Sequence, residues 1–436
     1  MFGRMSFGSL FVLALLAPGV CWAQAGYGYG PPNGPTGPVM PPYQGQYAPP
    51  LSGAPCPDGG NSRTIFEEIP DDRGWLFDDS PLSKSIESSF RHAFFRTEYL
   101  LWSFSDPGRV VLGAPLLSGD DLRDPINVPV NDRVTGAPIG FGVVPTLDGI
   151  QFSGNNGFRG TFGMPVGPGA FEASAFIFAT KTSHLNLTNE IQPLDPDDPF
   201  AIFDHPTFVA QPVLIEGAPS IESLVYTDSY QAQLTANAWG TEANYIFSPP
   251  NAGAGDFLTF SPLVGVRYFY FQERLNQTGV YQFSDDLVDF RPVTSRIDAS
   301  TINNSYGPQI GFRTEVNISR LTLGAEPKVM LGFNSYQATL FTQNILSDAE
   351  PDLTIHDKQT TFGPLADVKL YSRLALSQNL HVFAAYNFMW AGMLTRPYNN
   401  VVYNISAPGG AGAFQQDVRS TDVILQGLSA GAEFRY

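Results

Sequence analysis

Charged residues are scarce in this chain, and basic residues are the scarcer kind. Asp, Glu, Lys and Arg make up 15% of the 436 residues, with 24 basic residues against 41 acidic ones. Soluble globular proteins carry roughly 25% charged residues. The net charge of −17 argues against nucleic acid as a partner, because clustered Lys and Arg are needed to neutralise phosphates.

Cysteine is almost absent, since Cys21 and Cys56 are the two in the chain. Cys21 follows a segment typical of a secretory signal, in which Arg4 supplies positive charge and residues 7 to 20 are nearly all apolar. We expect a signal peptide over residues 1–25, whose cleavage removes Cys21 and leaves Cys56 without a disulfide partner. Val20 is larger than the Gly or Ala that lipoprotein processing favours, which argues against a lipid anchor.

Long apolar runs are also lacking beyond the signal, so the sequence predicts no transmembrane helix. Residues 26–60 hold 19 Gly or Pro among 35 positions, a composition that disfavours both strand pairing and a packed core. We therefore expect a Pro/Gly-rich linker and N-terminal extension over residues 26–91, largely disordered. It is either a spacer or an arm that docks on cell-wall material.

From about residue 92 onward, apolar residues recur at every second position, which is the period of a β-strand with two different faces. In residues 306–318 the even positions include Tyr306, Ile310 and Phe312, whereas the odd positions include Arg313 and Glu315. Runs of this kind reach the roughly 9 to 11 residues that a tilted strand needs to cross a bilayer. We predict ten strands, near residues 93–104, 153–164, 169–180, 226–248, 257–272, 304–318, 320–334, 363–376, 379–392 and 421–436.

The connections between these strands alternate between short and long. Short ones fall at 165–168, 249–256, 319 and 377–378, and long ones at 105–152, 181–225, 273–303, 335–362 and 393–420. This asymmetry is typical of outer-membrane barrels, which have short periplasmic turns and long extracellular loops. We therefore predict an all-β, antiparallel up-and-down transmembrane barrel over residues 92–436, with about ten strands and a range of ten to fourteen.

One predicted strand, 226–248, does not keep its pattern. Its apolar residues occupy even positions up to Ala238 and odd positions from Trp239 onward. A β-bulge would shift the face in this way, and two separate strands would raise the strand count.

The last strand carries the most specific signal. Ser429, Gly431, Phe434 and Tyr436 follow the polar, glycine, aromatic, aromatic spacing of a C-terminal insertion signal, which the outer-membrane assembly machinery recognises in its clients. A terminal aromatic residue belongs at the membrane interface, and the strand must pair to close the barrel. The alternative is an amphipathic edge strand in a soluble, secreted sandwich.

Three strand segments resemble the repeated signatures of putative beta-barrel porin family 7, a family of planctomycete outer-membrane proteins. They are Phe95–Trp102, Trp239–Phe247 and Val264–Leu275, and the likeness spans roughly residues 92–436. It implies a barrel in the outer membrane of a Gram-negative-type bacterium, with outer-membrane lipid as a partner. The segment after Phe158 departs from the longer aromatic-rich form that this family would have there.

If the apolar faces meet lipid, the opposite faces place eight basic and seven acidic residues in the lumen. Charges of both signs in a confined space should pair, because an unpaired buried charge costs several kcal/mol. We expect a plugged, ion-paired interior, or else a narrow pore along a polar path, since ten strands lie nearer the filled eight-stranded size than the open sixteen-stranded one. The predicted lumen-lining charges are Arg96, Glu98, Arg159, Glu172, Glu242, Arg267, Arg313, Glu315, Glu326, Lys328, Asp367, Lys369, Arg373, Glu433 and Arg435.

The main alternative to a porin-like or architectural barrel is a surface adhesin that binds through its long acidic loops. One of these loops carries Glu190, Asp195, Asp197, Asp198, Asp204, Glu216 and Glu222. Their spacing lacks the frame of a known calcium site, so we predict no metal site and no cofactor.

An enzymatic role is not expected either. The five histidines show no metalloprotease spacing, and Asp352, His356 and Asp357 on an outer loop are the remaining candidates for activating water. Aspartates and histidines are common in exposed turns, so we predict no catalytic residues.

Overall fold

The computed structural model describes residues 92–116, 126–131, 138–188, 208–248, 257–284, 289–405 and 414–436. The predicted signal peptide and linker lie outside these residues. Among them, no helix has both the length and the apolar character to cross a membrane.

Ten antiparallel strands form a closed ring, as the sequence predicts. Each strand pairs with two neighbours, in the order β1-β4-β5-β9-β10-β11-β12-β15-β16-β20, and β20 pairs again with β1. Each predicted strand corresponds to one strand of the ring. The bounds are β1 Phe94–Phe104, β4 Asn155–Val166, β5 Gly169–Phe178, β9 Ser229–Phe247, β10 Leu258–Phe283, β11 Arg291–Ile318, β12 Leu321–Met330, β15 Leu365–Ala375, β16 Leu380–Thr395 and β20 Ser420–Arg435.

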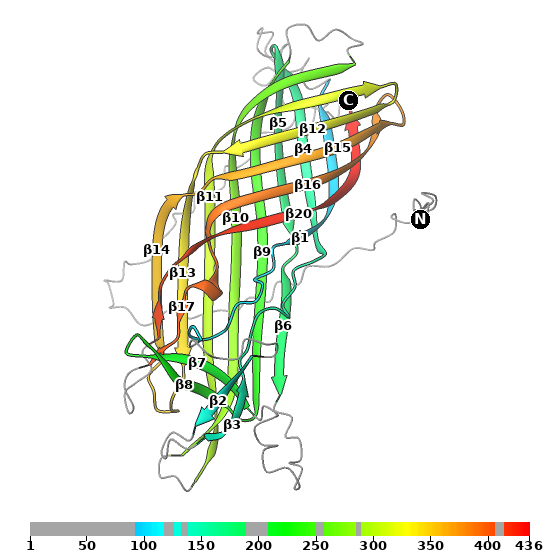
Figure 1. Ribbon diagram of the computed structural model, residues 1–436. Coiled ribbons are helices and arrows are strands. Elements are labelled where there is room, and N and C mark those ends of the chain that lie inside the picture. The colour runs from blue at the N-terminus through cyan, green and yellow to red at the C-terminus, as the bar shows by residue number, and fades with distance from the viewer. Residues whose placement is uncertain are drawn as a thin grey trace, which may run out of the picture. The chain divides into compact units, whose positions relative to one another are not determined.

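The short connections gather at one end of the ring. Gly167 and Pro168 join β4 to β5, and Ser319 and Arg320 join β11 to β12. Gly167 and Ser319 have positive φ angles of 57° and 55°, as expected in tight turns. Figure 1 shows the C-terminus at this end, which we call the turn end.

Three strands of the ring continue far beyond the others. At the end opposite the turns, β9, β10 and β11 join β6 (Lys181–Thr188), β13 (Phe333–Gln343) and β14 (Leu353–Phe362) in an open sheet with the order β6-β9-β10-β11-β13-β14. Figure 1 shows the long strands in green and yellow running past the end of β1. We call this six-stranded part the extension.

The polar and apolar faces of the long strands are reversed between the ring and the extension. Within the ring, Val266 on β10 points outward and is 60% exposed, while Arg267 points inward and is 5% exposed. Further along β10, the inward residues are the buried Phe271 and Leu275, and the outward ones are Gln272 and Arg274. The ring is therefore apolar outside and ionic inside, whereas the extension has an apolar core and a polar surface.

This exchange corrects two sequence-based expectations. The change of parity in residues 226–248 reflects neither a bulge nor a second strand, because β9 pairs with β10 in one continuous register. Residues 273–303 and 335–362 are largely strand rather than loop, since β10, β11, β13 and β14 occupy them. Both expectations assumed that apolar residues point outward along the whole of each strand. This is true only in the ring, where the outward surface meets lipid.

A separate five-stranded sheet lies at the far end of the extension, opposite the C-terminus (Figure 1). It consists of β2 (Asn127–Asn131), β3 (Pro138–Val143), β7 (Phe208–Ile215), β8 (Ala218–Tyr226) and β18 (Asn404–Ile405), around a small core that includes Val128, Val144 and Ala210. A short two-stranded pair, β17 (Val401–Val402) with β19 (Gln415–Gln416), follows the 3-10 turn η2 (Pro397–Asn399).

Candidate functional site: the charged interior of the ring

The candidate site is the set of charged side chains that meet inside the ring. Their strands alternate so that the outward residues are apolar and every second residue points inward. Each of the fifteen charges predicted for the lumen takes part in at least one ion pair with another of the fifteen.

Glu98 is the centre of the first group. Its carboxylate, which is 0% exposed, lies 3.1 Å from Arg96 Nε, 2.9 Å from Lys369 Nζ and 3.6 Å from Arg159 Nη1. Ser429 Oγ also donates to Glu98 Oε2 at 2.9 Å. One buried acid thus holds three cations from three different strands.

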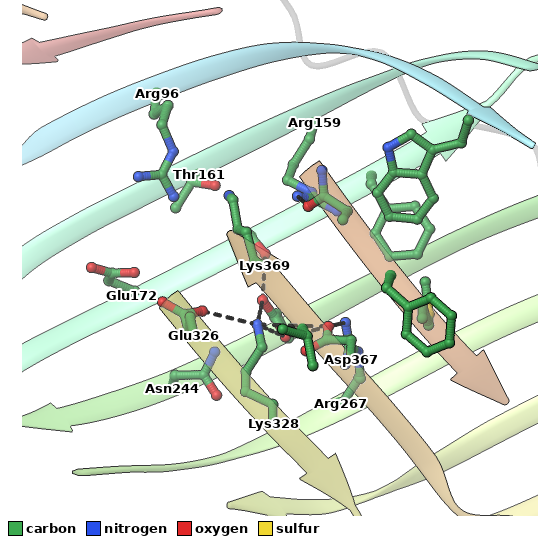
Figure 2. A pocket seen from close by; sticks show the side chains of 18 residues that line it. Arg96, Arg159, Thr161, Glu172, Asn244, Arg267, Glu326, Lys328, Asp367 and Lys369 are labelled. Atoms are coloured by element: carbon green, nitrogen blue, oxygen red, sulfur yellow. Dashed lines mark hydrogen bonds and ion pairs between the residues drawn. The ribbon is translucent and has the colours of Figure 1, made fainter. Parts of the chain in front are cut away.

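Four side chains, two basic and two acidic, form the second group (Figure 2). Lys328 Nζ lies 2.8 Å from Glu242 and 3.9 Å from Asp367, and Arg267 Nη2 lies 2.5 Å from Asp367 and 3.5 Å from Glu242. Each base therefore contacts each acid. Gln309 Nε2 donates a further bond to Glu242 at 3.1 Å.

A third group spans the interior. Arg313 on β11 makes a two-pronged contact with Glu172 on β5, with both distances at 2.7 Å, and also pairs with Glu326. Strands β5 and β11 are separated in the ring by β9 and β10, so this pair crosses the interior instead of joining neighbouring strands. Glu326 links it to the second group through Lys328 at 3.1 Å.

The remaining charges lie toward the turn end. Arg373 contacts Glu315 at 3.4 Å and Glu433 at 3.7 Å, and Glu433 also binds Arg96 at 3.2 Å and Arg435 at 2.8 Å. The Arg435 side chain is 41% exposed, so the network ends there at the surface.

Little space remains between these side chains. The cavity bordered by Arg159, Glu242, Lys328 and Lys369 has a volume of about 30 Å³, which is room for about one water molecule. Toward the turn end a second cavity, bordered by Arg313, Arg373 and Arg435, has about 270 Å³. The space between the charged side chains is therefore much narrower midway along the ring than toward the turn end.

An aromatic layer covers the other side of the charged groups. Trp102 and Phe104 from β1, Phe176 and Phe178 from β5, and Phe269 and Phe271 from β10 are all buried, with ring centroids 5.2 to 6.4 Å apart along the chain of contacts. The Arg159 guanidinium lies over Trp102 at 5.3 Å and over Phe176 at 5.7 Å. Leu112, Leu147, Ile150 and Phe152, from the connection after β1, belong to the same core.

Arg396 and Glu273 form a buried ion pair that the sequence analysis missed. Arg396, at the start of η2, binds both oxygens of Glu273 on β10 at 2.9 and 2.7 Å, and its Nη2 also donates to the Ser105 carbonyl at 3.1 Å. Both residues fall in stretches that the sequence predicts to be loops. The alternation of β10 continues through Glu273, and it could have placed this carboxylate among the inward residues.

A polar cluster at the core of the extension was missed for the same reason. Tyr226 and Tyr230 donate to Gln211 and Gln277 at 3.1 and 2.8 Å, and Gln277 donates to the Tyr403 hydroxyl at 2.9 Å. Burial raises the pKa of Tyr226 to about 12. Gln211, Tyr226, Tyr230 and Gln277 come from β7, β8, β9 and β10, so the cluster ties the five-stranded sheet to β9 and β10.

The four residues of the C-terminal signal divide between the two faces of β20. Ser429 is buried against Glu98 and Asn387, and Gly431 lies opposite Glu98 in the pairing with β1. Phe434 and Tyr436 point outward and are 49% and 75% exposed.

The candidate enzymatic residues each form a hydrogen bond with a different partner. His356 Nδ1 bonds to Thr339 Oγ1 at 3.0 Å, Gln343 donates to Asp352 at 3.4 Å, and Tyr336 donates to Asp357 at 3.4 Å. Across the described residues, no three His, Cys, Asp or Glu side chains gather as a metal site. Of the acidic loop, Glu216 and Glu222 are described, and its other five carboxylates lie outside the described residues.

The chain is similar to several solved outer-membrane proteins at low identity. The outer membrane protease OmpT from Escherichia coli is 10% identical, with a TM-score of 0.42, over 80% of this chain and 98% of that one. A FadL homologue from Pseudomonas aeruginosa is 11% identical, with a TM-score of 0.20, over 78% and 89%. A mutant of the monoaromatic hydrocarbon channel TodX is 7% identical, with a TM-score of 0.19, over 80% and 91%.

No curated protein matches the chain. The family model described as Putative beta barrel porin-7 (BBP7) matches residues 94–436, which is the whole ring together with the extension. The ten-stranded ring with an apolar outward surface is the architecture that such a family requires in the outer membrane. The chain belongs to the BBP7 family of outer-membrane β-barrel proteins.

Proposed function

We propose that this protein works in the outer membrane as a closed, architectural barrel that holds the extension and its five-stranded sheet at the cell surface. The observation that carries this proposal is the close packing midway along the ring, where nine of the paired charges border a cavity of about 30 Å³. A diffusion channel needs a continuous water-filled path, and wide ones use sixteen or more strands. In this orientation the turn end lies in the periplasm and the extension lies outside the cell.

The energetics of the charged groups favour a closed state. Separating one partner from a buried pair costs about 3–5 kcal/mol. A path along the axis would have to break several such pairs together, and the aromatic layer would still lie across it. A narrow, porin-like channel therefore requires a rearrangement of the whole network.

Conductance of the folded protein in a planar bilayer tests the proposal. We expect no stepwise ion current from the unmodified chain. The matched variant replaces Arg267, Asp367, Lys328 and Glu242 by Ser, which removes two positive and two negative charges. Glu326 keeps Arg313 as a partner in this variant. This variant should leak ions, and stepwise current from the unmodified protein would overturn the proposal.

Binding at the cell surface is a second candidate function. It is favoured by the amount of structure beyond the ring, namely the six-stranded extension and the five-stranded sheet. Retained binding of the full chain to cells or surface polymers, without ion current, would support an adhesin. Loss of that binding when Ala replaces exposed residues of the five-stranded sheet would locate it.

The two ends of the chain would serve export and assembly. Residues 1–25 would direct export, residues 26–91 would link the barrel to the periplasm or to cell-wall material, and β20 would present its signal to the assembly machinery. We also propose that the chain is not an enzyme, which fits a porin family and the separate partners of Asp352, His356 and Asp357. Peptide cleavage that disappears in His356→Ala would contradict this.

A further inference from the structure

The outward surface of the extension is the feature that the closed barrel does not explain. Its six strands turn one face to the core and the other to the outside, and the pairings fix which residues share the outward face. We call these outward residues the outer wall. They are the even positions of 182–188, 272–282, 294–304 and 354–360 and the odd positions of 229–237 and 335–343.

The outer wall is depleted in acid within a strongly acidic chain. It holds one carboxylate, Asp298, against three permanent cations, Arg274, Arg296 and Lys358. Most of its other residues are Asn, Gln, Ser and Thr. In the chain as a whole acidic residues outnumber basic ones by 41 to 24, so the outer wall has the opposite balance.

Two of the three cations are available to a ligand. Arg296 already pairs with Asp298. Arg274 and Lys358 are exposed, and within the described residues neither forms an ion pair. Arg274 lies four residues along β10 from Tyr270, and Lys358 lies four residues along β14 from Phe362. Each cation is therefore about 13 Å along the strand from an aromatic residue on the membrane side.

An aromatic group forms the base of the outer wall. Trp239 stacks on Tyr270 at 5.6 Å and 26°, and lies 5.0 Å from Tyr268. The Tyr268 hydroxyl donates to Asn304 at 2.6 Å, and the Tyr270 hydroxyl donates to Gln272 at 3.0 Å. Aromatic residues with one apolar side and one polar end mark the membrane interface.

We propose that the outer wall binds the phosphorylated sugar headgroups of an outer-leaflet glycolipid. The wall continues directly from the lipid-facing surface of the ring, so the next molecules outside it are the headgroups of the same lipids. Unpaired Arg and Lys suit phosphate, amide and hydroxyl side chains suit sugar hydroxyls, and the missing carboxylates avoid repulsion. A neutral lipid would give no reason for this reversed charge balance.

Binding of lipopolysaccharide to the folded full chain in a neutral detergent tests the proposal. We expect the double variant Arg274→Gln with Lys358→Gln to bind about three- to tenfold more weakly, from two exposed charge contacts. The swap Arg274→Lys with Lys358→Arg keeps both charges and should bind nearly as well as the unmodified protein. Dephosphorylated lipopolysaccharide should bind both proteins equally weakly.

The matched control removes two positive charges elsewhere, through Arg320→Gln at the short turn and Arg419→Gln before β20. This control should bind like the unmodified protein, and all variants should keep the heat-modifiable gel migration of a folded barrel. The proposal is overturned if the Arg274 and Lys358 double variant binds like the control. It is also overturned if phosphate-free lipid binds as tightly as lipopolysaccharide.

Discussion

Tyr268 and Tyr306 lie directly opposite each other on β10 and β11, and both strands exchange their polar and apolar faces at this pair. Toward the turn end, outward residues such as Val266 and Ile310 are about 60% exposed apolar side chains. Beyond the pair, the outward side chains become Gln272 and Asn304. The register continues unbroken, so the exchange reflects a change of surroundings from hydrocarbon to water and leaves the backbone pairing unchanged.

Glu98 should be essential for the stability of the ring. Glu98→Gln leaves Arg96, Arg159 and Lys369 without their shared buried acid, which we expect to lower the free energy of unfolding by about 3–5 kcal/mol. Urea unfolding in vesicles measures the change. Asp352→Asn is the control, because this exposed carboxylate accepts one long hydrogen bond, at 3.4 Å, and should shift the midpoint little.

Gly431 should tolerate no side chain. A Cβ atom there would lie 1.7 Å from the Thr97 carbonyl oxygen on the paired strand. We expect Gly431→Ala to cost about 1–3 kcal/mol through a forced backbone shift, and to slow closure between β1 and β20. Gly160→Ala is the matched control, since nothing lies within 4 Å of its Cβ position. Equal folding yields for the two variants would contradict the close approach.

The five-stranded sheet should loosen at high pH before the ring does. Tyr226 is buried, and its pKa is about 12, against 10.0 for a free tyrosine. The folded state therefore holds this proton more tightly, so its contribution is complete below pH 10 and is lost as the pH rises toward 12. The loss amounts to about 3 kcal/mol. Hydrogen exchange in β7 and β8 should rise over this range and should rise less in Tyr226→Phe.

Much of the ring could be predicted from the sequence because its chemistry is repetitive. Ten predicted strands correspond to the ten strands of the ring, since each lipid-facing run must alternate for its whole length. The same alternation predicts the inward charges, from Arg96 to Arg435. It does not predict their partners, because a pair such as Arg313 with Glu172 joins strands that are distant in both sequence and pairing order.

The extension could not be predicted, for a physical reason. Its strands bury apolar residues such as Leu275 and expose polar ones such as Arg274, which is the pattern of a soluble sheet. If outward residues are assumed to be apolar along every strand, these stretches are predicted to be loops. The same assumption leaves the pair of Glu273 and Arg396 unpredicted. A rule that allows the two faces to exchange along one strand predicts β10 and β11 at full length.

Thiol labelling on β10 tests the central claim most directly. In a background with Cys21 and Cys56 replaced by Ser, single cysteines at Val264 and Asn276 both point outward, below and above the Tyr268–Tyr306 pair. In intact cells, a membrane-impermeant thiol reagent should label Asn276→Cys and leave Val264→Cys unlabelled. Equal labelling of both, or labelling of Val264→Cys alone, would contradict a wall that meets lipid on one side of this pair and water on the other.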